Sequence, residues 1–341
     1  MAAARAELQR LWQRGCDFLG VDIAILGGGM TWVSERNLVA AISNAGGFGV
    51  IACGAMDPAR LAQEIEATFA LTGRPFGVNL ITMHPQLEEL IDVCARLNVQ
   101  HVVLAGGLPQ SSAVRKIKDS GAKAICFAPA PVLAKKLIRI GADALVIEGM
   151  EAGGHTGPVT TSVLAQEILP AIQELPVFVA GGIGRGEAIV SYLEMGAAGV
   201  QLGTRFVCAT ESVAHPNFKK AFIRAEARDA TLSVQLDPRF PVIPVRAIAN
   251  AGTRRFTEVQ REVIDKVDQG LLDQKAAQLE IEHFWAGALR RAVVDGDVEN
   301  GSLMAGQSVG LVKSEQPVAE ILAELIAQAE TALMRRREAR G

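Results

Sequence analysis

The chain has 341 residues, of which 49% are hydrophobic and 21% charged, a composition typical of a globular protein with one large α/β domain and a smaller insertion. Its formal net charge of −3 gives no general attraction to nucleic acid or anionic membranes. The charged N-terminus lacks a signal-peptide pattern and no apolar run has the length of a membrane span, so we expect a cytoplasmic protein.

Short apolar runs alternate with amphipathic stretches between residues 21 and 205, which is typical of repeated βα units. The continuous apolar character of these runs indicates strands that are buried on both faces, as in a parallel sheet. The pattern predicts strands at Asp22–Leu26, Gly49–Ala52, Gly77–Leu80, His101–Leu104, Ala124–Phe127, Ala144–Ile147, Val177–Ala180 and Gly199–Leu202. Eight such units favour a closed (β/α)8 TIM barrel over an open sheet.

Helices are predicted between the strands, for example at Pro58–Leu71, Pro85–Leu97 and Gly186–Met195. Asp57 and Pro58 suit the N-cap and the first position of a helix. Several helices are expected to stop at a glycine that leads into the next strand, namely Gly121, Gly141 and Gly196.

The βα rhythm stops after Arg205. Residues 214–287 are richer in charge, contain four prolines and indicate a mainly helical segment. We therefore expect a barrel formed by residues 1–213 and 288–341, with residues 214–287 as a smaller helical domain over the barrel mouth. A loop at residues 299–310 and a final helix from Pro317 to about Ala332 complete the chain.

Glycines follow several of the predicted strands, at the rim where TIM barrels place their active sites. Main-chain N–H groups that are exposed in such turns bind anions, and the loops after the last two strands commonly hold a phosphate. The predicted phosphate site is therefore Gly181, Gly182, Gly203 and Thr204.

Three polar residues stand out near this rim. His155 lies in a glycine-flanked loop, where its titration near neutral pH suits proton transfer better than a structural role. Asn79 ends a buried strand, so its amide needs a ligand such as a flavin ring or a neighbouring loop as partner. Gln201, in the last strand, could reach the same ligand. No histidine or cysteine pair has the spacing of a metal site, so none is expected.

The chain resembles the nitronate monooxygenase (2-nitropropane dioxygenase) family, which includes FMN-dependent enoyl-acyl-carrier-protein reductases. The matching motifs occur in family order over nearly the whole chain. They are residues 28–33, 44–49, 75–79, 148–157, 180–183, 200–206, 215–217 and 301–307.

The resemblance implies a barrel that binds FMN without a covalent bond, with His155 matching the family histidine beside the flavin. The main chain of Gly28, Gly29 and Met30 and the Asn79 side chain would contact the ring, and the loop at residues 302–307 would close over the cofactor. The other residues of the implied cofactor site are Glu148, Gly153, Gly154, Gly181, Gly182, Gln201, Gly203, Thr204, Met304, Gly306 and Gln307.

Two activities follow from the resemblance. The favoured one is a nitronate monooxygenase that oxidises alkyl nitronates with dioxygen, with His155 as base or as cationic partner of the anion. The alternative is a reductase in which NADH is the electron donor and an enoyl thioester, on a carrier protein or coenzyme A, is the substrate. A third interpretation is a barrel that binds a phosphorylated metabolite without redox chemistry. The sequence leaves a homodimer open as the oligomeric state.

A basic segment could serve the reductase alternative. Lys219, Lys220, Arg224 and Arg228 recur at helical spacing and are interpreted first as a solvated helix face. A docking patch for an acidic carrier protein is the other interpretation.

Overall fold

A computed structural model describes residues 2–54, 56–285 and 287–339 of the chain. Within these residues the large sheet consists of parallel strands β1 (Ile25–Gly27), β2 (Gly49–Ala52), β3 (Phe76–Ile81), β4 (His101–Ala105), β5 (Lys123–Phe127), β6 (Ala144–Glu148), β8 (Val177–Ala180) and β9 (Gly199–Leu202). Their order in the sheet is β1-β9-β8-β6-β5-β4-β3-β2. All eight predicted strands are confirmed, three of them with the predicted bounds.

The sheet closes on itself between its first and last strands. Leu26 of β1 forms a parallel bridge with Phe48, which precedes β2. The main chain supports this bridge with hydrogen bonds from Gly27 N to Phe48 O and from Phe48 N to Ile25 O, each 2.9 Å long. The fold is therefore the predicted (β/α)8 barrel.

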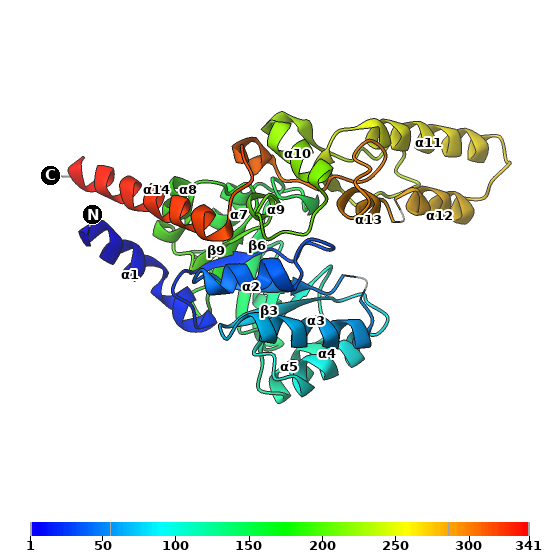
Figure 1. Ribbon diagram of the computed structural model, residues 1–341. Helices are drawn as coiled ribbons and strands as arrows, with labels where there is room; N and C mark the ends of the chain where they lie inside the picture. Colours follow the sequence, from blue (N-terminus) through cyan, green and yellow to red (C-terminus); the bar gives the residue numbers. More distant parts are fainter. Residues whose placement is uncertain (1, 55, 286, 340–341) are drawn as a thin grey trace.

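Helices surround the barrel (Figure 1). Those that precede residue 216 are α1 (Ala2–Leu19), α2 (Arg36–Asn44), α3 (Pro58–Leu71), α4 (Leu87–Arg96), α5 (Ser111–Asp119), α6 (Pro131–Arg139), α7 (Thr161–Ile168), α8 (Gly186–Glu194) and α9 (Thr204–Val207). The Asp57 side chain accepts a hydrogen bond from Arg60 N at the start of α3, which confirms the predicted cap. Gly121, Gly141 and Gly196 all have positive φ, as helix-stop glycines require.

The later part of the chain contains α10 (Pro216–Arg224), the 3-10 turn η1 (Ala227–Asp229), β10 (Ala230–Leu232), β11 (Val245–Ile248), α11 (Ala251–Asp268), α12 (Gln274–Phe284), α13 (Ala288–Val293), η2 (Gln307–Leu311) and α14 (Val318–Glu338). Figure 1 shows α11 and α12 as a hairpin that projects away from the barrel. A small apolar core of their own includes Phe256, Val263 and Ile281. The division of the chain at residues 214 and 287 stays a prediction.

One part of this later region differs from the expectation of a helical segment. Strands β10 and β11 pair with β7 (Gly154–His155) in a three-stranded antiparallel sheet, in the order β10-β11-β7. Val245 pairs with His155, and Arg246 pairs with Gly154. The loop that was predicted to present His155 is therefore tied to the inserted segment by sheet pairing.

The core has two layers around the barrel wall. Inside the barrel, a cluster of buried residues from all sides includes Phe48, Val146 and Phe178. Outside, a larger cluster joins the strands to the surrounding helices, and α14 packs against α8 and α1 (Figure 1). In the described part of the chain, no helix is both long enough and apolar enough to cross a membrane.

Candidate active site

A cavity of about 800 Å³ opens at the end of the barrel where the parallel strands terminate. This is the rim on which TIM barrels carry their active sites, and the volume lies within the roughly 300–1,000 Å³ of small-molecule sites. Its wall brings together nearly the whole predicted set: His155, Gly28, Gly29, Met30, Asn79, Glu148, Gly153, Gly154, Gly181, Gly182, Gln201, Gly203, Thr204, Met304 and Gly306. Gln307 is the exception.

Glycines allow the main chain to lie against the cavity. Gly181 and Gly182, directly after β8, have φ values of +97° and +70°, which favour glycine over residues with a side chain. Both residues line the cavity without a side chain, so the main chain of this turn is open to a ligand there. On the opposite side, a Cβ atom at Gly29 would lie 2.9 Å from the Asn79 side chain, so only glycine fits there.

Polar side chains without protein partners line the floor of the cavity. Asn79 and Gln201 are 5% and 8% exposed, and Glu148 is half-buried beside them at the rim. Asn79 and Gln201 lie on the barrel-facing side of β3 and β9. Among the described residues, none of the three side chains forms a hydrogen bond or ion pair. Because a buried polar group without a partner is costly, this floor suits a ligand with many donors and acceptors.

His155 stands above this floor and remains exposed. The pairing of β7 with β11 fixes its main chain, and Thr156 N donates to Pro244 O at 3.1 Å. The protein packed around the ring lowers the pKa of His155 below its ordinary value of 6.5. The imidazole is therefore neutral at neutral pH and can accept a proton.

Arg246 holds this loop in place, and sequence reasoning missed it. Its side chain is 4% exposed, its Nε donates to Met150 O at 2.8 Å, and its Nη1 donates to Ala230 O at 2.6 Å. Its carbonyl oxygen also accepts a hydrogen bond from Ala305 N at 3.3 Å. One buried residue thus joins the His155 loop, β10 and the loop at residues 302–307. Its partners are main-chain carbonyls, which leave no signal in a sequence.

The loop at residues 302–307 closes one side of the cavity. Gly306 N donates to Thr204 Oγ1 at 2.9 Å, and Gln307 N donates to Glu151 O at 2.9 Å. A Cβ atom at Gly153 would lie 2.6 Å from Gly306 N, so the two loops approach through glycine. Met304 and Gly306 line the cavity from this loop.

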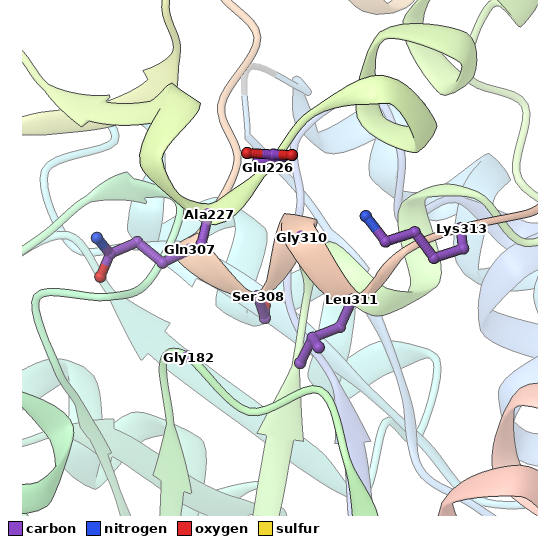
Figure 2. Close-up of a pocket in the computed structure, with 8 residues that line it drawn as sticks. All are labelled: Gly182, Glu226, Ala227, Gln307, Ser308, Gly310, Leu311 and Lys313. Carbon is purple, nitrogen blue, oxygen red and sulfur yellow. The ribbon is translucent and has the colours of Figure 1, made fainter.

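The Gln307 side chain belongs to a smaller neighbouring pocket of about 450 Å³. Figure 2 shows this pocket with Gly182 below and Glu226 above, and with Gln307 and Lys313 at its left and right sides. Gly182 and Ser308 line both spaces, so the smaller pocket adjoins the predicted phosphate site from outside. The Gln307 side chain therefore lies outside the main cavity, in a pocket that it shares with Gly182.

The outer wall of the cavity is apolar. It includes Met83, Leu108, Leu133, Ile243, Leu289 and Val293. The only ionisable side chains that line the cavity, among the described residues, are Glu148 and His155; no lysine or arginine contributes to the wall. The cavity thus offers an apolar surface without a fixed positive charge.

The predicted basic segment on α10 is not a uniform exposed patch. Lys219 is 6% exposed, and its Nζ donates to Ala209 O at 2.8 Å and to Glu315 Oε1 at 2.7 Å. Arg228 pairs with Glu226. Both interpretations of the segment are therefore wrong for Lys219, because its long stem and paired ammonium group are packed inside the protein.

Comparisons with known proteins agree with this geometry. A family model described as "Nitronate monooxygenase" matches residues 13–93 and 86–328. FabK from Thermotoga maritima superposes with a TM-score of 0.87 and is 36% identical, covering 96% of this chain and 98% of its own.

Two curated relatives differ in what their names state. The (3aS,4S,5R,7aS)-5-hydroxy-7a-methyl-1-oxo-octahydro-1H-indene-4-carboxyl-CoA dehydrogenase of Rhodococcus jostii (strain RHA1) is 30% identical, over 92% of this chain and 94% of the relative. The nitronate monooxygenase of Paraburkholderia phytofirmans is 28% identical, over 90% of this chain and 92% of the relative.

Proposed function

The chain belongs to the nitronate monooxygenase family of flavin-dependent oxidoreductases, and on that premise we propose that it is an FMN-dependent reductase of α,β-unsaturated acyl thioesters. This reductase activity is the alternative, not the favoured one, of the two activities that the family resemblance implies. FMN supplies the site, when bound, with a group that accepts hydride from NADH and donates it to the substrate.

The residues of the cavity fit FMN. The unpartnered amides of Asn79 and Gln201 match the polar edge of an isoalloxazine ring, and Gly28 to Met30, which line the same cavity, would contact it through their main chain. Gly181, Gly182, Gly203 and Thr204 would hold the phosphate through main-chain N–H groups. Gly153, Gly154, Met304 and Gly306 would cover the cofactor, whereas Gln307 would face its phosphate from the smaller pocket.

The observation that carries the choice of substrate is the absence of a cation from the described cavity wall. A nitronate is an anion that needs a positive partner or N–H donors of its own beside the flavin, and the exposed main-chain N–H groups of the site are assigned to the FMN phosphate. His155 does not supply that charge, because its lowered pKa keeps the ring neutral. An enoyl thioester carries no charge at its reacting end, and its acyl chain suits an outer wall of residues such as Leu108, Leu133 and Leu289.

Two relatives support a thioester substrate. One is named as a carboxyl-CoA dehydrogenase. The other is FabK, from the enoyl reductase branch of the family, which superposes over almost the entire chain. The first of these names states a coenzyme A thioester. Nitronate monooxygenase is the second candidate, and the nitronate monooxygenase of Paraburkholderia phytofirmans favours it.

Under this proposal the chain itself performs three tasks. The apolar outer wall binds the acyl group and excludes water from the reacting carbons. The floor residues orient the cofactor ring, and Arg246 fixes the loop that carries His155. His155, exposed and neutral, exchanges protons between solvent and the cavity.

Anaerobic stopped-flow absorbance of the bound flavin tests the proposal. NADH is expected to reduce the flavin, and crotonyl-CoA or crotonyl carrier protein is expected to reoxidise it. Comparison of the two thioesters identifies the carrier. Rapid reduction of the flavin by propyl-2-nitronate, together with no reoxidation by either thioester, would establish the second candidate instead.

A further inference from the structure

The cavity holds two ionisable side chains, and the family resemblance gives a proton-transfer role to only one of them. His155 lies above the floor on β7. Glu148 lies in the floor, at the last position of β6. A carboxyl group in that place invites a functional explanation, because glutamate is rarely enclosed by protein unless it is paired.

The register of β6 explains why Glu148 faces the cavity. Side chains alternate along a strand, and Ala144 and Val146 belong to the cluster that fills the barrel interior. Leu145 and Ile147 belong to the cluster beneath the surrounding helices. Glu148 continues the inward series, one layer above Val146, and pairs with Ala180 of β8. It therefore caps the apolar interior of the barrel with a carboxyl group.

Among the residues that the structure describes, no charged group compensates Glu148. The charged side chains on the elements packed around β6 are exposed or form hydrogen bonds with other groups. Lys123 of β5 donates to Phe18 O. Glu151 accepts from Thr161 N and Oγ1, Arg246 donates to main-chain carbonyls, and Glu167 of α7 is exposed. β8 carries no ionisable residue, and β7 carries only His155.

We propose that Glu148 is the acid of the site: it stands in the cavity as a neutral carboxylic acid and delivers the proton that adds to the substrate, while His155 returns a proton to it from solvent. The assignment rests on the proposed reduction of enoyl thioesters. A hydride supplied by bound FMN would form the new C–H bond at Cβ, and the electron pair of the C=C bond would move to Cα. The O–H bond of Glu148 breaks as the second C–H bond forms at Cα, which leaves a carboxylate.

The electrostatics of the two groups agree with these roles. Burial raises the pKa of Glu148 from 4.5 to about 8, so the carboxyl keeps its proton at neutral pH. The protein packed around part of the ring lowers the pKa of His155, so the imidazole lacks its second proton at neutral pH. When two groups in one site shift in opposite directions, the raised carboxyl acts as the acid and the lowered imidazole as the base.

Infrared difference spectroscopy tests the neutral acid without any substrate. Holoenzyme is titrated from acidic to alkaline pH, and the C=O stretch of a protonated carboxyl group is followed. Wild-type protein is expected to keep one such band at neutral pH and to lose it near pH 8, and Glu148→Gln is expected to lack it. Glu167→Gln changes an exposed glutamate on α7 and serves as the matched control, with the band intact. Absence of the band from wild-type protein at pH 7, or its presence in Glu148→Gln, would overturn the assignment.

Turnover tests the delivery of the proton. The kcat/KM of wild-type enzyme for crotonyl-CoA is expected to fall above about pH 8, as the acid form is lost. Glu148→Gln should retain FMN, lose this alkaline limb and reduce the thioester ~10²-fold more slowly. An unchanged alkaline limb in Glu148→Gln overturns the proton delivery, whereas failure of wild-type flavin to react with any enoyl thioester overturns the proposed function itself.

Discussion

The proposed phosphate site, formed by main-chain N–H groups around Gly182, predicts that Gly182→Val weakens FMN binding. Gly182 has φ +70°, and an added Cβ would lie 3.0 Å from Glu151 Cβ. A left-handed conformation costs a residue with a side chain ~1–2 kcal/mol. In the free variant the loop can relieve this strain by changing its conformation. FMN binding must then return the loop to the strained conformation, which costs the same free energy. Because 1.4 kcal/mol is about tenfold in affinity, strain alone weakens binding ~5–30-fold, and the valine methyl groups also obstruct the phosphate.

Quenching of FMN fluorescence by apoprotein measures the dissociation constant. Gly196→Val is the matched control, because Gly196 also has positive φ (+104°), has no neighbour within 4 Å of an added Cβ, and ends α8 away from the cavity wall. It is expected to lower the unfolding temperature while FMN affinity stays at the wild-type value. Wild-type affinity in Gly182→Val, or an equal loss of affinity in both variants, would refute the assignment of Gly182 to the phosphate site.

Three further predictions follow from the geometry around His155. His155→Ala should keep FMN and slow thioester reduction by ~10²-fold, and single-turnover rates at wild-type level would contradict its role. Because the pKa of His155 is lowered, its base form persists at neutral pH and kcat/KM should decline only below the ordinary pKa of 6.5; an acid limb above that value would count against this assignment. Arg246→Met removes two charge-assisted hydrogen bonds worth about 1.5–3 kcal/mol each, so the unfolding temperature and kcat should fall together, and a wild-type unfolding temperature with a wild-type pH profile would exclude the positioning role.

Much of the barrel could be predicted because its signals are local. Each parallel strand is a short apolar run, and each glycine-bearing loop follows its strand directly in the sequence. In a barrel the C-terminal ends of the strands lie at one rim, so the topology alone predicts that residues at or after these ends lie close together. The structure places Gly28, Asn79, Glu148, Gly182 and Gln201 around one cavity there. Once the barrel is recognised, the candidate site follows from topology.

The parts that escaped prediction depend on contacts between distant segments. Strand β7 has two residues and β10 has three, too few to show an alternating pattern, and the pairing of β7 with β11 joins segments about 90 residues apart. Lys219 has the sequence pattern of a solvated face, yet Glu315 from far along the chain neutralises it inside the protein. Arg246 likewise has no motif, because main-chain carbonyls are its partners.

The central claim is that the protein binds FMN and reduces an enoyl thioester in a cavity whose described wall has no lysine or arginine. Its most direct test is the product of a single anaerobic turnover in deuterated water, with the flavin reduced beforehand by dithionite and crotonyl-CoA then added. We expect stoichiometric flavin reoxidation and butyryl-CoA with one deuterium at Cα, which receives the solvent-derived proton, and one at Cβ, because the hydrogen on a flavin reduced by dithionite also comes from the deuterated solvent. A flavin that stays reduced in the presence of the thioester, or a purified protein that binds no FMN, would contradict the account.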